Sequence, residues 1–201
     1  MKTVILCGGK GTRMDSLTEK IPKPLVEIGG KPALWHIMKI YAMHGFNDFV
    51  LCLGYKGAEI KKYFEKNNPD GWKIEFVDTG ENSSKSERIH KIRKFVGGEN
   101  FFLAYGDDLS NVDISELKGL HEKNKKVATI TAVKIESPFG VLETNVKSEI
   151  TKFREKPMLD YWMNGGFMVL SSKIFDYLKF GELEKEVFGK LVAERQIQAF
   201  K

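Results

Sequence analysis

The chain has 201 residues, of which 42% are apolar and 29% are charged, and its formal net charge is +5. A chain of this size and composition suits one domain with a real core. The positive charge permits anionic partners, but no cluster of Lys and Arg alternates with aromatic residues as in nucleic-acid-binding faces. We therefore expect a mildly basic surface, a small polyanionic ligand and no nucleic acid.

In chain order, short apolar runs alternate with amphipathic segments as far as residue 133. The apolar runs predict strands at residues 4–7, 49–53, 73–77, 101–105 and 127–133. The amphipathic segments predict helices at residues 32–44, 58–66, 86–96 and 114–123, the third of them capped by Ser86. Such alternation is typical of βαβ units around a buried parallel sheet, where ligands bind beyond the C-terminal strand ends at a switch in strand order.

From residue 135 the pattern changes to strands with tighter connections. These strands are expected at residues 139–143, 150–154 and 163–170, followed by helical segments at 173–177 and 183–195. The apolar stretch IQAF at 197–200 has the pattern of a further strand. No internal repeat, low-complexity tract or linker interrupts the chain, so residues 1–201 are expected to form a single domain.

Cysteine usage and hydropathy bear on the compartment. Cys7 and Cys52 lie in apolar runs without the spacing of a zinc site, so both are expected to be buried free thiols. The apolar N-terminal run ends at Gly8, and no apolar run is long enough to span a bilayer. We therefore expect neither a signal peptide nor a membrane partner, and we predict a cytoplasmic location.

The first strand runs directly into a loop of glycines and cations, in the stretch ILCGGKGTR. This loop contains Gly8, Gly9, Lys10, Gly11, Thr12 and Arg13. Glycines let backbone N–H groups approach an anion closely, and a guanidinium can bind phosphate oxygens bidentately. Farther along, Pro22 and Pro24 are expected to hold Lys23 in extended backbone and present its ammonium at low entropic cost. The pattern predicts a phosphate-binding loop.

Two familiar phosphate loops do not match. A Walker A loop requires Ser or Thr after its Gly-Lys pair, and here Gly30 and Lys31 are followed by Pro32. A dinucleotide fingerprint starting at Gly9 requires a third glycine where Met14 stands. A hydride-transferring dehydrogenase is therefore disfavoured.

Several motifs in a fixed order point to one family. They are GGKGTR at 8–13, GGKPALWHI at 29–37, YGDD at 105–108, REKP at 154–157 and NGG at 164–166. Together they resemble the sugar-1-phosphate nucleotidylyltransferase family, and the second motif is similar to its glucose-1-phosphate cytidylyltransferases. The resemblance implies an α/β, Rossmann-like fold with a mixed, mostly parallel sheet flanked by helices.

The resemblance also implies an activity and its residues. The expected reaction is Mg²⁺-dependent transfer of a cytidylyl group from CTP to glucose 1-phosphate, with direct in-line attack on the α-phosphorus and release of pyrophosphate. Implied nucleotide contacts are Cys7, Gly8, Gly9, Lys10, Gly11, Thr12, Arg13, Lys23, Ser83, Arg88 and Gly106. Implied sugar-phosphate contacts are Gly140, Glu155, Lys156, Asn164 and Gly165. Arg13, Lys23 and Asp107 take catalytic roles, and Asp107 is the implied metal ligand.

The chain departs from the family pattern at a few points. Asp108 stands where the cytidylyltransferases usually have glycine, and it is either a second acidic contact or, as we favour, a turn residue. Residues 85–87 read KSE where a Thr-Gly-Gly segment is usual, and residues 67–71 replace a long insertion that commonly helps assembly. A homo-oligomer is therefore possible but not implied. Relatives continue with another aspartate that helps to hold the metal, so we expect the chain to lack the C-terminal part of the family.

Two alternatives to the implied activity stay open at this point. The first is a nucleotidylyltransferase that uses another nucleoside triphosphate or another phosphorylated acceptor. The second is a shortened module that binds nucleotide or sugar phosphate without turnover.

Overall fold

The computed structural model describes residues 1–9, 21–68 and 70–201. The strands are β1 (Thr3–Leu6), β2 (Glu27–Ile28), β3 (Lys31–Pro32), β4 (Asp48–Leu53), β5 (Lys73–Asp78), β6 (Phe101–Tyr105), β7 (Ala128–Val133), β8 (Val141–Thr144), β9 (Ile150–Arg154), β10 (Met163–Leu170) and β11 (Ile197–Phe200). The helices are α2 (Ala33–Met43), α3 (Gly57–Lys66), α4 (Lys85–Lys91), α5 (Arg93–Val96), α6 (Ile114–Asn124), α7 (Ile174–Tyr177) and α8 (Phe188–Ala193). Shorter 3₁₀ turns cover Lys23–Leu25 and Leu178–Phe180, and a π-helical turn covers Leu183–Val187.

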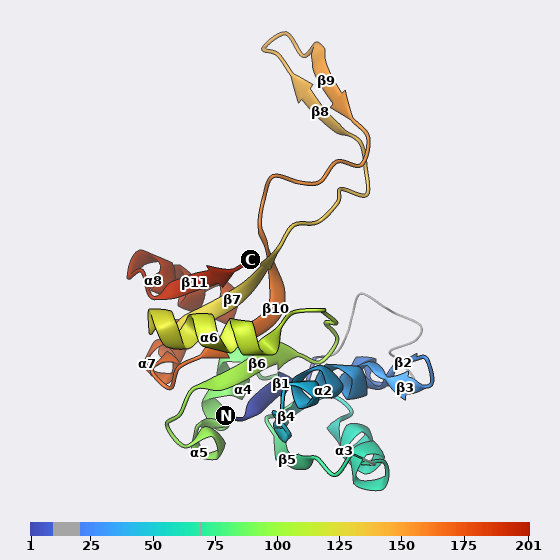
Figure 1. Cartoon of the computed structure of the whole chain (residues 1–201), viewed down its shortest axis with the longest axis vertical. Coiled ribbons are helices and arrows are strands. Elements are labelled where there is room, and N and C mark those ends of the chain that lie inside the picture. Colours follow the sequence, from blue (N-terminus) through green and yellow to red (C-terminus); the bar gives the residue numbers. More distant parts are fainter. Residues whose placement is uncertain (10–20, 69) are drawn as a thin grey trace.

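A seven-stranded sheet in the order β11-β7-β10-β6-β1-β4-β5 forms the middle of the molecule (Figure 1). β1 pairs in parallel with β4 and β6, β4 with β5, and β7 with β11. β10 differs, because it lies antiparallel between β6 and β7. The sheet is therefore mixed and mostly parallel, as predicted. After β1 the chain builds β4 and β5 on one side and β6 on the other, so the strand order reverses between β1 and β6.

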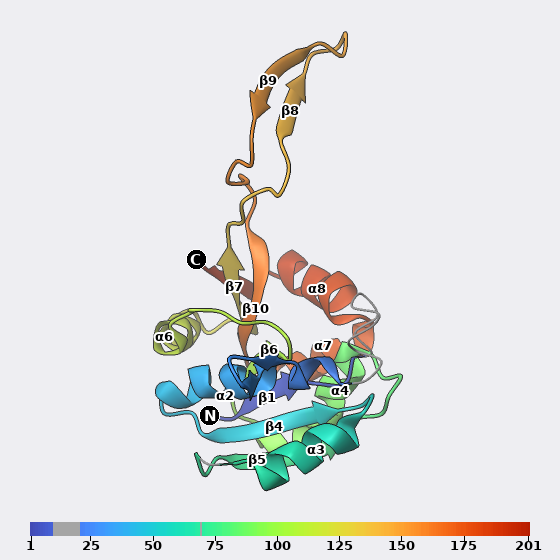
Figure 2. The ribbon, with the colours of Figure 1, turned by 90° about the vertical axis from the view of Figure 1, so that its right-hand side faces the viewer.

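Helices cover both faces of this sheet (Figure 2). Side chains alternate along each strand, so Val4 faces one hydrophobic cluster and Ile5 faces the other. The first cluster is closed by α4, α5, α7 and α8, and the second by α2, α3 and α6. Each fully buried aliphatic or aromatic side chain contributes about 1.5–3 kcal/mol. The resulting three-layer core fixes the strand ends that carry the site.

Residues 134–162 leave the sheet between β7 and β10 as a long arm that ends in the β8–β9 hairpin (Figures 1 and 2). On one face of the hairpin, Leu142 pairs with Phe153, and both side chains are exposed. On the other face, Glu143 and Lys152 form an ion pair at 3.3 Å. The hairpin is therefore amphipathic, and none of the residues that the structure describes covers its apolar face. Its two strands were predicted, but their projection from the body was not.

The start of α4 differs from the prediction that Ser86 caps it. The Ser84 hydroxyl accepts a hydrogen bond from the backbone N–H of Glu87 at 3.2 Å, and the Glu87 carboxylate accepts one from the N–H of Ser84 at 2.7 Å. This reciprocal capping box starts the helix at Lys85 and leaves Ser86 buried inside it. In addition, α4 and α5 are separate helices where one was predicted.

The prediction of an extended backbone at Lys23 was also wrong. Lys23 begins a 3₁₀ turn, which closes because Leu25 N–H donates to the Pro22 carbonyl at 2.7 Å and Val26 N–H donates to the Lys23 carbonyl at 3.1 Å. Pro24 fits this turn because its fixed φ suits the first residues of a helix. The predicted helix at 183–195 is likewise a π-helical turn followed by α8.

Within the part of the chain that the structure describes, none of the helices is both long and apolar enough to cross a bilayer.

Candidate functional site

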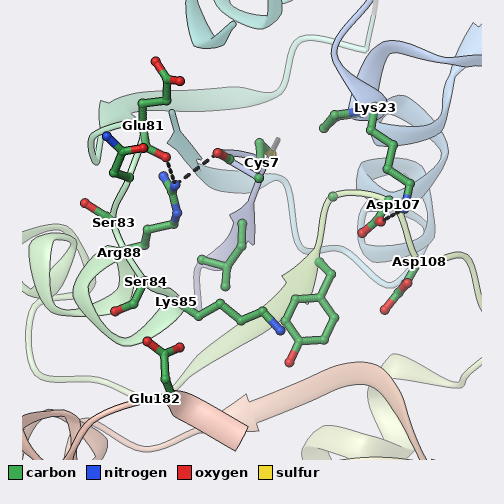
Figure 3. Close-up of a pocket in the computed structure, with 17 residues that line it drawn as sticks. Cys7, Lys23, Glu81, Ser83, Ser84, Lys85, Arg88, Asp107, Asp108 and Glu182 are labelled. Carbon is green, nitrogen blue, oxygen red and sulfur yellow. Dashed lines mark hydrogen bonds and ion pairs between the residues drawn. The ribbon is translucent and has the colours of Figure 1, made fainter. Parts of the chain in front are cut away.

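A cavity of about 690 Å³ lies at the C-terminal ends of β1 and β6 (Figure 3). Its lining residues are Leu6, Cys7, Gly8, Gly9, Lys23, Pro24, Glu81, Asn82, Ser83, Ser84, Lys85, Arg88, Tyr105, Gly106, Asp107, Asp108 and Glu182. The volume falls within the range of about 300–1,000 Å³ that is typical of small-molecule sites. Its position is the reversal of strand order, where a ligand is expected in such sheets.

The structure brings the described members of the predicted nucleotide site together. Those that line the cavity are Cys7, Gly8, Gly9, Lys23, Ser83, Arg88 and Gly106, together with Asp107. The remaining predicted loop residues, Lys10, Gly11, Thr12 and Arg13, lie outside the described residues, as does Met14.

Arg88 forms hydrogen bonds to three segments around this cavity. Its guanidinium donates to Oγ1 of Thr79 (2.7 Å) and to the carbonyl oxygens of Gly8 (3.0 Å), Glu81 (3.1 Å) and Leu53 (3.2 Å). Arg88 is only 4% exposed. Burial lowers the pKa of the guanidinium, which nevertheless stays protonated. One buried cation therefore joins the loops that follow β1, β4 and β5.

Two glycines make room for this guanidinium. A Cβ atom at Gly8 would lie 2.0 Å from an Arg88 nitrogen. At Gly54 a Cβ atom would lie 2.6 Å from the same nitrogen and 2.8 Å from the Gly8 carbonyl oxygen. These separations are far shorter than van der Waals contact, so a larger residue at either position displaces Arg88.

Ser83 also forms hydrogen bonds in this part of the cavity wall. Its hydroxyl donates to the Thr79 carbonyl and accepts from the Lys91 ammonium at 2.9 Å. Lys91 also donates to the Thr79 carbonyl at 2.7 Å. The side chains of Ser83 and Arg88 thus shape the loop at residues 79–84. That they also contact a nucleotide stays a prediction.

Lys23 and Asp107 form an ion pair at the edge of the cavity, with about a third of each side chain exposed (33% and 32%). Asp107 and Asp108 place two carboxylates at the end of β6, and Mg²⁺ takes one or two carboxylates together with phosphate oxygens. No group of three or more His, Cys, Asp or Glu side chains among the described residues is placed to hold a metal. The described residues therefore fit a metal that binds together with phosphate.

Asp108 belongs to the cavity wall as well as to the turn after β6. Its carboxylate lies against the start of β10, where a Cβ atom at Gly166 would be 2.3 Å from Oδ2. Burial raises the pKa of Asp108, and Asp107 adds to this effect, whereas Lys23 and Lys85 oppose it. Asp108 is therefore more than a turn residue. Its half-buried carboxylate also lines the cavity, where a ligand can contact it.

Tyr105, the last residue of β6, connects several elements across the cavity wall. Its hydroxyl donates to Oε1 of Glu184 at 2.8 Å. Lys85 is paired with the same oxygen, and its Nζ lies 4.5 Å from the centroid of the Tyr105 ring. Burial and the hydrogen bond to Glu184 raise the pKa of Tyr105 well above its ordinary value. The phenol therefore stays protonated around neutral pH.

The predicted sugar-phosphate residues fall into two groups. Asn164 and Gly165 lie in β10 directly before Gly166, where a Cβ atom would meet Asp108 of the cavity wall. Gly140, Glu155 and Lys156 lie on the arm, where a Cβ atom at Gly140 would be 3.1 Å from Oε2 of Glu155. None of these five predicted residues is among those that line the cavity. One chain therefore does not bring all of the predicted sugar-phosphate residues to one place.

Cys7 lines the cavity and, like Cys52, is buried and free, as predicted. Burial is the main reason why the pKa of Cys7 is raised, and it raises the pKa of Cys52 to about 12. Both thiols therefore stay protonated and unreactive. Cys7 contributes to the shape of the cavity and not to nucleophilic chemistry.

Sequence reasoning missed Lys85, Lys91, Tyr105 and Glu184. Tyr105 had a signal, because it ends a strand directly before the Gly-Asp motif at 106–107. No sequence pattern indicated Glu184, because its partner Lys85 is 99 residues away in the chain.

Comparisons with known proteins point to one family. The nucleotidyl transferase family matches residues 2–199. The chain is 46% identical over 199 residues to a Bacillus subtilis protein named probable glucose-1-phosphate cytidylyltransferase, covering 89% of this chain and 78% of the relative. It is 37% identical over 225 residues to the glucose-1-phosphate cytidylyltransferase of Salmonella typhimurium, covering 100% of this chain and 87% of the relative. The solved structure of HddC from Yersinia pseudotuberculosis is 28% identical, with a TM-score of 0.75 over 99% of this chain and 89% of that chain. The chain therefore belongs to the nucleotidyl transferase family, as its motifs predicted.

Proposed function

We propose that this protein transfers a cytidylyl group from CTP to glucose 1-phosphate and releases pyrophosphate, with CDP-glucose as the product. The observation that carries the proposal is the cavity at the ends of β1 and β6, which is lined by Gly8, Gly9, Lys23 and Asp107. Two relatives named glucose-1-phosphate cytidylyltransferase support the choice of nucleotide and acceptor.

The reaction joins an oxygen of the sugar phosphate to the α-phosphorus of CTP and breaks the bond to pyrophosphate. Because negative charge gathers on the leaving group, the site must supply cations and in-line placement more than a covalent nucleophile. Lys23 takes the first role in this proposal, and Arg13, which lies outside the described residues, is expected to share it. Asp107 would hold Mg²⁺, which neutralises charge on the triphosphate when bound. Asp108 offers a second carboxylate beside it.

The loop at residues 79–84 is the proposed source of base selection, because it lines the cavity on the side away from Lys23. Cytosine and uracil differ in a donor and an acceptor on the pyrimidine edge, and each polar group left unpaired costs about 1–3 kcal/mol. Ser83 and Arg88 hold this loop in one shape. In the proposal they select CTP by fixing the groups that meet the base.

GTP is the second candidate nucleotide, and specific relatives favour it. The chain is 33% identical over 213 residues to the mannose-1-phosphate guanyltransferase of Yarrowia lipolytica, although it spans only 58% of that protein. HddC has also been solved in complex with GMP-PN, at 27% identity to this chain. A nucleotide-binding module without turnover is the third possibility.

For the acceptor, we assign Asn164 and Gly165 to the cavity of their own chain, and Glu155 and Lys156 to the cavity of a second copy. The exposed Phe153 on the uncovered face of the arm favours contact with another chain. Mixing Asp107→Asn with Lys156→Ala, each inactive alone, is expected to restore part of the activity. If the mixture stays inactive at concentrations where copies associate, the arm does not act between copies.

Pyrophosphate release tests the transfer directly. The four ribonucleoside triphosphates are each combined with glucose 1-phosphate, mannose 1-phosphate and galactose 1-phosphate in the presence of Mg²⁺. The proposal expects the highest kcat/KM with CTP and glucose 1-phosphate. Preference for GTP would replace the cytidylyl assignment, and binding of CTP without release in any combination would favour the binding module.

A further inference from the structure

The ammonium of Lys85 lies in the cavity wall between two parts of the proposed site. Lys85 directly follows the loop at residues 79–84, and its side chain extends along the wall (Figure 3). Its Nζ lies 4.5 Å from the centroid of the Tyr105 ring, and Tyr105 ends β6 just before Gly106 and Asp107. The ammonium is therefore placed between the loop proposed to select the base and the carboxylate proposed to hold Mg²⁺.

Lys85 is held at both of its ends. Its backbone starts α4 within the capping box that Ser84 and Glu87 form. Its ammonium is paired with Glu184 and also faces the Tyr105 ring. A carboxylate and an aromatic face that share one ammonium restrain a side chain that is otherwise flexible. The ammonium is therefore held at a defined place in the wall before any ligand binds.

Glu184, the partner of Lys85, is fixed in turn by the core and by β6. It belongs to the π-helical turn Leu183–Val187, and both end residues of this turn are fully buried. The Tyr105 hydroxyl donates at 2.8 Å to Oε1 of Glu184, the same oxygen that pairs with Lys85. Burial alone would raise the pKa of Glu184, but the hydrogen bonds from Lys85 and Tyr105 outweigh burial and lower it. Glu184 is therefore a charged partner at neutral pH.

This charge balance decides which ligand group suits Lys85. An ammonium has three N–H donors, and the pair with Glu184 takes one, so others can face the cavity that Lys85 lines. A phosphate that drew Lys85 away would leave Glu184 as an anion beside another anion. Lys23 differs, because its partner Asp107 gains Mg²⁺ in the proposed function. A neutral acceptor, such as a sugar hydroxyl group, leaves the pair of Lys85 and Glu184 intact.

We propose that Lys85 is a further substrate-contacting residue, which donates hydrogen bonds to ring hydroxyl groups of a sugar. Glu184 is the positioning residue that holds its ammonium at the cavity. The inference rests on the proposed function, which brings two sugars into this cavity, the ribose of CTP and the glucose of the acceptor. Both offer the same chemistry to an ammonium, and the two arms of the experiment below tell them apart.

Calorimetric titration with ligands that lack one hydroxyl group tests the contact without any turnover. In the first arm, CTP with Mg²⁺ is compared with 2′-deoxy-CTP and 3′-deoxy-CTP. In the second arm, glucose 1-phosphate is compared with analogues that each lack one ring hydroxyl group. Wild type should prefer the complete ligand in at least one arm, and Lys85→Met should reduce that preference about 3- to 10-fold. Lys85→Arg, which keeps donors and charge, should recover most of it.

Glu184→Gln tests the positioning role, because it keeps an oxygen acceptor but removes the charge that holds the ammonium. It should reduce the same preference, and its effect should be less than additive with that of Lys85→Met. Additive effects would show that Glu184 does not act through Lys85.

The chain offers a matched control outside the cavity. Lys190 pairs with Glu194 at 2.9 Å, and the Tyr177 hydroxyl donates to the same carboxylate at 2.6 Å. The exposed fractions of this pair, 44% and 39%, match the 45% and 38% of Lys85 and Glu184. Such exposed pairs contribute little to folding, so both Lys-to-Met variants should fold. Lys190→Met should leave every preference at its wild-type value.

The outcomes separate this inference from the proposed transfer. If wild type releases no pyrophosphate but Lys85→Met loses the preference for a hydroxyl group, the transfer fails and the role of Lys85 stands. If pyrophosphate is released and Lys85→Met keeps the wild-type preference in both arms, the transfer stands and the role of Lys85 is overturned. Equal weakening of complete and deoxy ligands would show a contact to phosphate and also overturns it. Wild-type protein that binds neither CTP nor glucose 1-phosphate overturns both.

Discussion

Replacing Arg88 by Met tests whether one buried guanidinium holds the nucleotide side of the cavity together. Arg88→Met keeps much of the side-chain length but removes the donors to four acceptors, among them the carbonyl oxygens of Gly8 and Leu53. The Leu53 and Gly8 carbonyl oxygens keep other donors, the N–H groups of Thr79 (2.9 Å) and Tyr55 (3.3 Å), so the variant loses hydrogen bonds from a charged group and does not leave these acceptors unpaired. Each such hydrogen bond contributes about 1.5–3 kcal/mol, and water from the cavity can replace some of them, so we expect the free energy of unfolding to fall by about 3–4 kcal/mol. Domains of this kind have only about 5–15 kcal/mol in total.

Urea unfolding followed by circular dichroism measures this loss. Arg93→Met is the matched control, because Arg93 is exposed and its guanidinium lies 5.3 Å from the centroid of the Phe175 ring. We expect the control to lose less than about 1 kcal/mol. Gly8→Ala should be costly in wild type and much less costly in the Arg88→Met background, because its Cβ atom then no longer meets the guanidinium.

The same variant should affect the nucleotide. The carbonyl groups of Gly8 and Glu81 belong to loops that line the cavity, so losing their shared donor lets both loops move. KM for CTP is expected to rise, and the preference for CTP over UTP to fall. If Arg88→Met is no less stable than Arg93→Met, the reasoning is refuted, because the four hydrogen bonds would then have no net value.

Three further changes test other parts of the molecule. Asp107→Asn should abolish Mg²⁺-dependent pyrophosphate release and Asp108→Asn should reduce it much less, since an amide keeps the shape but loses the charge; a magnesium titration gives the order. Burial lowers the pKa of His121, so below about pH 6.5 the unfolded chain binds a proton that the folded chain does not. Stability should therefore fall as pH drops from about 7 to 5, and urea unfolding of His121→Gln should show a weaker dependence. The buried Tyr41 hydroxyl has no hydrogen-bond partner among the described residues, so Tyr41→Phe should gain about 1 kcal/mol; a loss of that size would reveal a partner.

The periodic pattern of apolar residues predicted most of the core. Within the helix predicted at residues 32–44, the apolar residues Leu34, Ile37, Met38 and Tyr41 recur at helical spacing, and all four are fully buried. This succeeds because the spacing of side chains around a helix depends on local geometry alone. The position of the cavity could be predicted for a similar reason, since parallel strands bring their C-terminal ends to one edge of the sheet.

The cap of α4 was predictable from the sequence but was assigned to the wrong serine. A capping box requires Glu or Gln three residues after the cap, and Glu87 follows Ser84 by that spacing. Ser86 lies closer than Ser84 to the apolar residues of the helix. The spacing rule outweighs this proximity, because the first turn of a helix needs partners for its backbone N–H groups before it needs an apolar face.

The arm could not be predicted in the same way. The pattern of β8 and β9, with Leu142 and Phe153 on one face and Glu143 and Lys152 on the other, is that of a half-buried hairpin. Such a pattern indicates that the apolar face is covered. The pattern is the same whether the body of this chain or another chain covers that face. The location of Glu155 relative to the cavity therefore required the tertiary structure.

The ion pairs around the cavity join residues far apart in the chain, which explains both why they were missed and what they do. Lys23 and Asp107 are separated by 84 positions. Sequence reasoning could bring their loops to one edge but could not pair their side chains. With no triphosphate bound, Lys23 neutralises Asp107, so neither charge is left alone at the cavity edge. A phosphate alone would draw Lys23 away and leave Asp107 without its partner, whereas a phosphate that arrives with a divalent cation supplies a new partner to each. In the proposed function, the pair therefore disfavours metal-free nucleotide and favours joint binding of the triphosphate and its cation.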